Sequence, residues 1–239
     1  MSEPLLIRYM QPLLAGRRAE CFEVAGQALR QGASAEDLLC EVVWPAMSQV
    51  QRLYDDDRIN AALEHMACRI NRTVADQLQA DLPKRPPRGR RILIANADNE
   101  TEELGAQIVA DLFQADGWDV YFIGGGVPDD EVLATVGQLR PEGFLIFGAA
   151  PAAIASTRAM IERIRDVGVC PTMNIIVTGG IFTRADGLWQ EIGADAYCEL
   201  PRDVLTLANG LGPREPRPPS LGIVKKRRRR RRNAPALAR

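Results

Sequence analysis

The stretch RILIANADNETEELG, residues 91–105, decides the fold of the second half of the chain. It opens with a short run of branched apolar residues, Ile92–Ala95, and continues as a polar, carboxylate-rich segment. Such a run is typical of a buried strand, and the apolar residues at three- and four-residue spacing that follow predict a helix. The stretch therefore predicts a strand, a polar loop and a helix, in that order.

The same pattern repeats four times after it. Short runs rich in branched and aromatic residues recur at Val120–Ile123, Phe144–Phe147, Ile175–Thr178 and Ala196–Cys198. Helical stretches are expected near 103–116, 129–139, 153–167, 183–192 and 202–209. Strand–helix alternation predicts an α/β fold over residues 91–210, with a Rossmann-like (flavodoxin-like) sheet of five parallel strands. Ligands bind such sheets at the carboxyl ends of the strands, so the loops there are candidate sites.

The first 82 residues read as helical throughout. Glycine is confined to three positions, and apolar residues recur at helical spacing. We expect helices near 3–14, 17–31, 35–53 and 58–81, forming a four-helix bundle, with Pro45 kinking or dividing the third of them. Residues 83–90, which contain three prolines and a glycine, are expected to form a linker between the two domains.

Composition favours a globular chain in a reducing cytoplasm. Apolar residues make up 46% of the 239 residues, and no run approaches the roughly 20 apolar residues that a membrane span needs. Five scattered cysteines without a C-x-x-C pair argue against disulfides and a zinc site. The single histidine excludes most catalytic and metal sites built on several histidines.

The charge is divided unevenly along the chain. Residues 211–239 carry eleven Lys or Arg and one acidic residue, including an unbroken basic run from Lys225 to Arg232. We expect this tail to be disordered, because it cannot bury enough apolar surface to offset ordering. Non-specific contact with DNA phosphates is one role for it; a solvated end and a segment that folds back on the acidic body are the alternatives.

Small residues in the strand-end loops carry a resemblance to a known family. Glu100-Thr-Glu102-Glu-Leu-Gly105 aligns with a D/E-x-H-x-x-G motif, Gly148-Ala149-Ala150 with an S-x-L motif, and Gly179-Gly180 with a Gly-Gly pair. In this respect the chain resembles the cobalamin-binding domain of corrinoid proteins. The resemblance implies that Gly105, Gly124, Gly148, Ala149, Gly179 and Gly180 lie close to a ligand.

The helical region extends the resemblance. Tyr54, followed after nine residues by Glu64-His65, is similar to the W-x9-E-H signature of light-sensing cobalamin regulators of the CarH type. The opening residues resemble the AerR/PpaA antirepressors more closely still. The resemblance implies a ligand between the bundle and the sheet, contacted by Tyr54, Glu64, His65 and Cys68.

Two departures from the family pattern leave the cofactor open. Glu102 stands where the family has the histidine that ligates cobalt from below, and Gly148 stands where it has a serine. Cobalamin is the first expectation, bound without a lower protein ligand. Haem, with His65 as its metal ligand, and a linear bilin such as biliverdin, with Cys68 as its attachment point, are the alternatives.

Each candidate residue also has an ordinary structural interpretation. Cys68 can be a small core residue, and Glu100 and Glu102 can stabilise the start of a helix. Gly124 and the two glycines after it can form a turn that clears room for a ligand.

The leading hypothesis is a sensory regulator without enzymatic activity. In it, a light- or redox-sensitive tetrapyrrole rearranges the two domains and so signals to a transcription factor or repressor. The alternatives are a corrinoid methyl carrier of a methyltransferase system and a ligand-free interaction domain. A homo-oligomer remains open.

Overall fold

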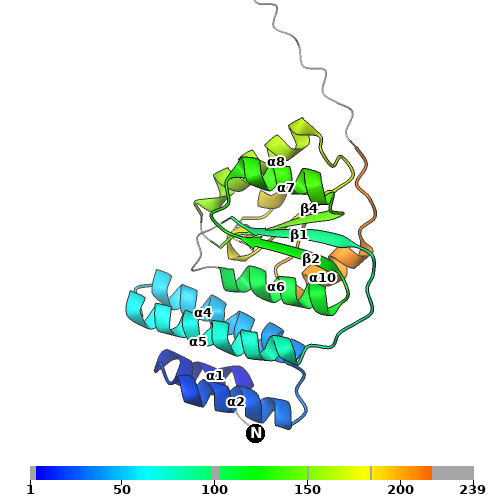
Figure 1. Cartoon of the computed structure of the whole chain (residues 1–239). Helices are drawn as coiled ribbons and strands as arrows, with labels where there is room; N and C mark the ends of the chain where they lie inside the picture. Colours follow the sequence, from blue (N-terminus) through cyan, green and yellow to red (C-terminus); the bar gives the residue numbers. More distant parts are fainter. Residues whose placement is uncertain (1–3, 98–102, 150, 184, 217–239) are drawn as a thin grey trace, which may run out of the picture.

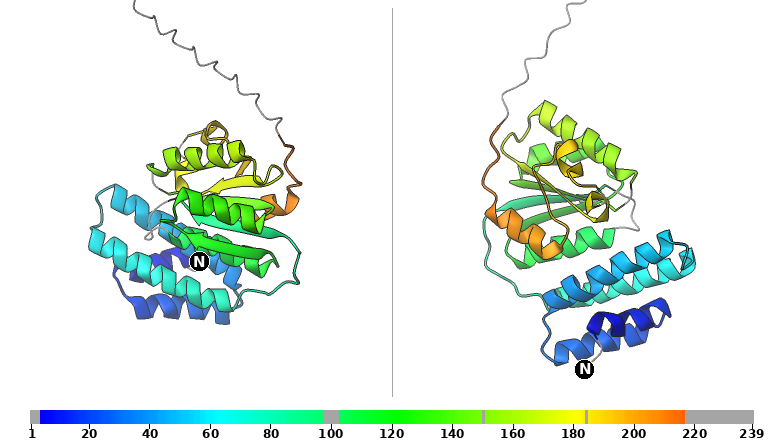
Figure 2. Two further views of the ribbon diagram at one scale, coloured as in Figure 1. Left: turned by 45° about the horizontal axis from the view of Figure 1, so that its top comes forward. Right: turned by 180° about the vertical axis from the view of Figure 1, so that it is seen from behind.

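A computed structural model describes residues 4–97, 103–149, 151–183 and 185–216. Within these ranges, no helix is both long enough and apolar enough to cross a membrane. The elements stack in layers, from α1 and α2 at one end, through α4 and α5, then α6 and α10, to the sheet and finally α7 and α8 (Figure 1). Two further views show the same order of layers (Figure 2).

The first half is the expected bundle of helices. Its elements are α1 (Leu5–Leu14), α2 (Arg18–Arg30), α3 (Ala35–Leu38), η1 (Leu39–Val43), α4 (Trp44–Asp55) and α5 (Ala61–Ala80). Ser34 caps α3 by accepting from Asp37 N, and Asn60 caps α5 by accepting from Leu63 N. The helix expected from residue 58 therefore begins at residue 61.

Pro45 does not divide the third helix of the bundle. The chain runs from α3 through the π-helical stretch η1 straight into α4, where Pro45 occupies the first turn. A proline inside a helix lacks an N–H and crowds the carbonyl four residues earlier, and a π-helical turn makes room for it. The π stretch thus replaces the expected break.

The second half is the expected parallel sheet with helices on both faces. The strands are β1 (Arg91–Asn96), β2 (Asp119–Gly124), β3 (Gly143–Phe147), β4 (Asn174–Thr178) and β5 (Ala196–Tyr197). The helices are α6 (Glu103–Ala115), α7 (Asp129–Leu139), α8 (Ala153–Val167), η3 (Gly180–Thr183), α9 (Leu188–Glu191) and α10 (Pro201–Gly210). All pairings are parallel in the order β2-β1-β3-β4-β5, so the strand order reverses between β1 and β3. This confirms the predicted fold class.

One expected helix and the expected linker differ from the sequence prediction for local reasons. The helix expected over 183–192 is reduced to the short α9, which begins after Gly187 because that residue adopts a left-handed conformation with φ of 80°. The expected linker has no regular structure but is tied to the sheet domain: Arg85 and Arg88 both pair with the buried carboxylate of Asp116.

The described part of the basic tail also departs from expectation. Residues 211–216 pack against the sheet domain, because Arg214 N donates to Thr172 O at 2.8 Å and its guanidinium pairs with Asp195. The basic run Lys225–Arg232 lies outside the described residues.

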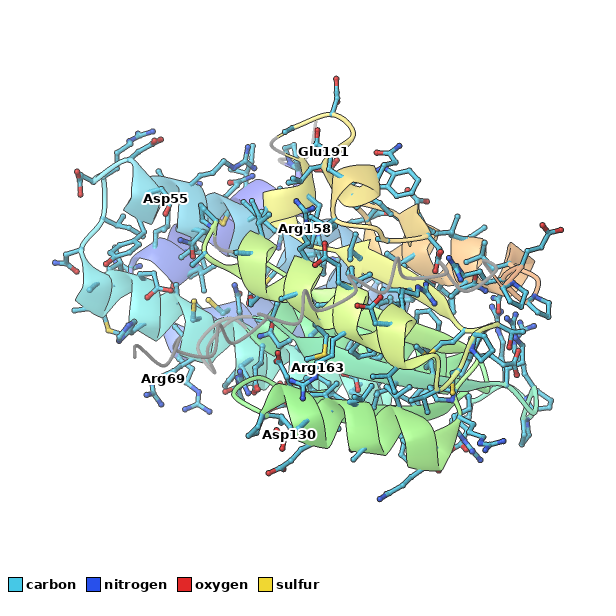
Figure 3. The ribbon with its side chains drawn as sticks, turned by 90° about the horizontal axis from the view of Figure 1, so that it is seen from above. Asp55, Arg69, Asp130, Arg158, Arg163 and Glu191 are labelled. Atoms are coloured by element: carbon cyan, nitrogen blue, oxygen red, sulfur yellow. The ribbon has the colours of Figure 1, made fainter. Side chains whose placement is uncertain are left out.

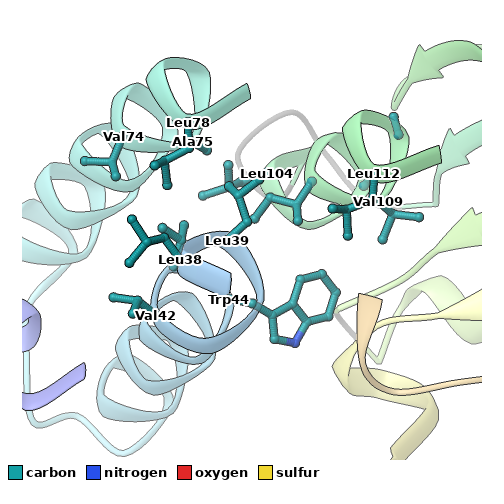
Figure 4. Close-up of a cluster of buried hydrophobic side chains, with 14 of the residues drawn as sticks. Leu38, Leu39, Val42, Trp44, Val74, Ala75, Leu78, Leu104, Val109 and Leu112 are labelled. Carbon is teal, nitrogen blue, oxygen red and sulfur yellow. The ribbon is translucent and has the colours of Figure 1, made fainter. Parts of the chain in front are cut away.

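One apolar core joins the bundle to the sheet. Leu39 and Leu78 of the bundle pack in the same buried cluster as Leu104 and Leu112 of α6 (Figure 4). At one edge, Arg202 of α10 pairs with Glu36, Asp37 and Glu41 of the bundle. The two domains therefore share a continuous interface that fixes how the bundle lies over the sheet.

A buried carboxylate lies in that interface. Asp111 of α6 is 6% exposed; its Oδ1 accepts from Gln79 of α5 at 2.9 Å, and its Oδ2 has no partner. Burial raises the pKa of Asp111 to about 6. Because the folded-state pKa lies above the unfolded value, the contribution of Asp111 to stability is fully present at low pH and is lost as pH rises through about 6.

Asp111→Asn is expected to remove this pH dependence. The variant should gain about 1–2 kcal/mol of unfolding free energy at pH 8, where wild-type Asp111 is charged, and almost nothing at pH 4. Urea unfolding at the two pH values measures the difference. Asp81→Asn, at an exposed carboxylate directly after α5, is the control; an equal gain in both variants would contradict the assignment.

Candidate functional site

A cavity of about 550 Å³ lies between the bundle and the carboxyl ends of the strands. Helices α4 and α5 form one wall; the other comes from Leu104 in α6, Phe147 at the end of β3, and Ala149 and Gly180 in the loops after β3 and β4. The cavity therefore occupies the position where parallel sheets bind ligands, with the bundle as its lid.

One face of α4 supplies most of the bundle wall. Its lining residues recur at helical spacing and are Trp44, Met47, Ser48, Gln51, Arg52, Tyr54 and Asp55. Asp55 marks the outer end of this helix, seen from above in Figure 3. From the sequence, Tyr54 is predicted as a site residue, while Trp44 and Met47 are equally well interpreted as ligand contacts or as core residues of the bundle. Helical spacing from Tyr54 is the signal that could have found the others.

A bridging carboxylate organises the wall formed by α5. The Cys68 thiol donates to Glu64 Oε1 at 3.0 Å, and His65 Nε2 lies 3.4 Å from Glu64 Oε2. The Glu64 side chain is 12% exposed, whereas that of His65 is 62% exposed. Glu64 can therefore hold the imidazole by one nitrogen and leave the other nitrogen available to a ligand.

Aromatic side chains close the inner end of the cavity. Trp44 and Phe147 meet edge to face, with ring centroids 6.0 Å apart, and both are almost completely buried. Figure 4 shows Trp44 projecting from the bundle beside the apolar interface with α6. This inner part is apolar, while Gln51, Asp55 and Glu199 bring polar groups to the outer part.

The predicted small residues divide into two groups. Ala149 and Gly180 line the cavity, and a side chain added at Gly180 would meet open space. Gly105 does not line it, because the Phe147 ring occupies the room that a side chain on Gly105 would need. Because Gly105 has no side chain, α6 can pack closely against Phe147 of β3.

Three further glycines likewise serve packing. Gly148 is covered by Ile181 and Phe182. Gly179 has a φ of +109° and touches the Gly148 backbone, and Gly124 has a φ of +68° beside the Glu103 carboxylate. Gly124 borders a second, smaller cavity of about 190 Å³. Glu100 and Glu102 lie outside the described residues, as does Ala150.

The donor set of the main cavity fits a metal that brings its own equatorial ligands. In the described part of the chain, no group of three or more His, Cys, Asp or Glu is placed to hold a bare ion. His65 offers a single nitrogen, which suits an axial position on a macrocycle. The apolar inner end and polar outer part suit a flat ring with polar arms, so the residues present fit a corrinoid.

Comparisons with known proteins point to the same cofactor. Residues 90–205 match a family model described as a B12 binding domain, and residues 6–79 match a second model with that description. The curated dimethylamine corrinoid protein 3 of Methanosarcina acetivorans is 22% identical, over 87% of this chain and 97% of its own. Monomethylamine corrinoid protein 1 of the same organism is 21% identical, over 76% of this chain and 85% of its own.

A solved structure shares the fold. The monomethylamine corrinoid protein of Methanosarcina barkeri superposes with a TM-score of 0.74 at 17% identity, covering 85% of this chain and 96% of that one. The likeness spans the bundle and the sheet together.

These findings correct the functional prediction. A light- or redox-sensing regulator of transcription is wrong, because the relatives that match most of the chain are named as corrinoid proteins. Their names agree with the expectation that the chain is not itself an enzyme. They support cobalamin and give no support to haem, a bilin, a transcription-factor partner or DNA contact.

The architecture had been predicted correctly, but its use had not. The resemblance to CarH-type proteins implies a helical bundle followed by a B12-binding sheet domain. The two family models match these parts, one over residues 6–79 and the other over residues 90–205. The chain therefore carries a cobalamin-binding domain, composed of a helical B12-binding module followed by a Rossmann-like one.

Proposed function

We propose that this chain is a corrinoid-binding carrier protein of a methyltransferase system. It would hold its cofactor between the bundle and the sheet and present it to a separate methyltransferase subunit. The observation that carries the proposal is the cavity, whose two walls come from the two B12-binding modules. The match to methylamine corrinoid proteins over most of both chains supports a carrier role.

Each wall of the cavity has a distinct role in this proposal. Trp44 and Phe147 would exclude water from the inner edge of the ring, while Gln51 and Arg52 would hydrogen-bond its polar arms. The bound corrinoid would supply a cobalt centre that accepts and releases a methyl group. The chain itself would bind, orient and shield that centre.

His65 is the residue that we propose as the protein's nitrogen ligand. It faces the cavity from the bundle side, and its neighbour Glu64 holds the imidazole in place. The position that resembles the family's lower ligand is Glu102, and a carboxylate is a poor ligand for low-spin cobalt. An imidazole from the bundle would thus stand in for the one from the sheet.

The direct test is binding of hydroxocobalamin to the purified full-length chain. We expect a stable complex with altered absorption bands. When a chemical reductant then takes the bound Co(III) to Co(I), a corrinoid methyltransferase and its methyl donor are expected to methylate the cofactor, because the electron pair of Co(I) accepts the methyl group as the donor's leaving group departs. A chain that binds hydroxocobalamin but cannot be methylated by any such enzyme would contradict the carrier role. Failure to bind any corrinoid would contradict the proposal as a whole.

His65→Ala is expected to weaken hydroxocobalamin binding about ten-fold and to shift the absorption bands of the bound cofactor, since a nitrogen ligand is lost. Titration followed by absorption spectroscopy measures both effects. The matched control is Arg69→Ala, at an exposed position one turn further along α5 (Figure 3). Identical spectra for wild type and His65→Ala would show that the imidazole is not a ligand.

A further inference from the structure

The end of strand β1 holds a buried amide with no hydrogen-bond partner among the described residues. Asn96 is 6% exposed, and both its Oδ1 and its Nδ2 are buried and unpaired. Burying an unpaired amide is costly, so each such group in a folded protein calls for an explanation. At the carboxyl end of a strand, a ligand that completes the hydrogen bonds is a direct explanation.

Strand alternation places the Asn96 side chain on the face of the sheet covered by α6. Ile92 and Ile94 belong to the core on that face, whereas Leu93 and Ala95 belong to the core on the opposite face. Side chains alternate along a strand, so Asn96 continues the row of Ile92 and Ile94. The smaller cavity of about 190 Å³ borders Asn96 from the other side, because its lining includes Phe144, Ile146 and Met160 of the core on the opposite face.

Phe147 stands between Asn96 and the main cavity. The two residues are register partners in neighbouring strands, so their side chains lie beside each other on one face. Phe147 lines the main cavity, and its ring fills the room left by Gly105. Rotation of this ring would open a path from the cavity to the Asn96 amide.

We propose that Asn96 is a ligand-binding residue of the main cavity, reached when Phe147 turns aside, and that it pairs with a carboxamide arm of the corrinoid. This inference rests on the proposed function. A carboxamide presents an N–H donor beside a carbonyl acceptor, and Asn96 presents the complementary pair, so two hydrogen bonds form together. A carboxylate or phosphate has no donor and would leave Asn96 Oδ1 unpaired.

The test compares two buried asparagines in the full-length chain. Asn96 is unpaired, whereas Asn174, at 7% exposure, donates through Nδ2 to Gly212 O at 2.8 Å. Each is changed to leucine. The probes are hydroxocobalamin and dicyanocobinamide, which carries the carboxamide arms without the nucleotide. Equilibrium dialysis gives the affinities, and thermal unfolding without ligand gives Tm.

Asn96→Leu is expected to bind both probes at least ten-fold more weakly, with an unchanged or higher Tm, because an unpaired polar group is replaced by an apolar one. Asn174→Leu is expected to bind as wild type does and to have a lower Tm, because a hydrogen bond is lost. Phe147→Leu, with a shorter side chain in the path, is expected to bind dicyanocobinamide several-fold faster.

Three outcomes would overturn the inference. Equal affinities of wild type and Asn96→Leu would show that Asn96 does not contact the ligand. A Tm loss in Asn96→Leu as large as in Asn174→Leu would show that the Asn96 amide is hydrogen-bonded within the protein. If stopped-flow absorption gave the same association rate for Phe147→Leu as for wild type, the Phe147 ring would not control access to Asn96. A wild-type chain that binds neither probe would overturn the proposed function, and this inference with it.

Discussion

Replacing Gly180 by phenylalanine is expected to weaken hydroxocobalamin binding by at least 100-fold while leaving the fold intact. A side chain at Gly180 would project into open space at the wall of the main cavity, and the φ of this residue is not in the left-handed region. A phenyl group there would therefore occupy the ligand's volume without backbone strain. Equilibrium dialysis measures the loss, and thermal unfolding shows whether the fold is preserved.

The control for Gly180→Phe is the same substitution at Gly212. A side chain there also meets open space, and Gly212 is exposed and does not line the main cavity. Gly212→Phe should bind hydroxocobalamin as tightly as wild type does. Strong binding by Gly180→Phe would mean that the corrinoid lies elsewhere, and the cavity between bundle and sheet would lose its assigned role.

The fold could be predicted from the sequence because each strand is a compact apolar run between polar loops. The expected run Ile92–Ala95 lies within the observed strand Arg91–Asn96, and Phe144–Phe147 lies within Gly143–Phe147. Such runs become buried on both faces only in a parallel sheet covered by helices. Helix ends were harder to place, because a cap such as Asn60 or a left-handed Gly187 decides them locally.

The site was predicted only in part, for a different physical reason. A signature with helical spacing identified Glu64, His65 and Cys68, and all three line the cavity. The glycine pattern could not reveal which neighbour fills the room that a glycine leaves. At Gly105 that neighbour is Phe147, more than 40 residues away in sequence, and only the folded chain brings the two together.

Function was the least predictable level. A bundle over a B12-binding sheet serves both regulators and carriers, so the Tyr54-x9-Glu64-His65 pattern selected an architecture and not a use. The relatives, which match across both domains, are named as corrinoid proteins and therefore favour a carrier over a regulator. Glu102, which stands where the family pattern has its metal-ligating histidine, makes the origin of a protein ligand to cobalt the chemical question for this chain.

Asp195→Ala is expected to lower the unfolding free energy by about 3 kcal/mol or more, because it breaks a partly buried charge cluster. Asp195 Oδ2 accepts from Ile175 N at 2.7 Å and pairs with Arg165, while Oδ1 accepts from Arg214 Nε at 2.7 Å. The side chains of the two arginines are 18% and 13% exposed, so both charges would stay buried without the Asp195 carboxylate that balances them.

The cluster also joins three distant parts of the chain. Asp195 precedes β5, Arg165 lies in α8, and Arg214 belongs to the segment that leads into the basic tail. Loss of the carboxylate should therefore loosen the last strand and residues 211–216 together. Urea unfolding measures the stability, and hydrogen exchange at the amide of Ile175, which donates to Asp195, reports the local change.

Glu162→Ala provides the matched control. Glu162 pairs with Arg158, which lies on the outer face of α8 (Figure 3), and the two side chains are about 60% exposed. An exposed pair of this kind contributes about 0.5 kcal/mol or less, because water screens it and its side chains are mobile. If Asp195→Ala cost no more than Glu162→Ala, the Asp195 cluster would not anchor β5, and the stability of the sheet edge would have to come from its apolar contacts alone.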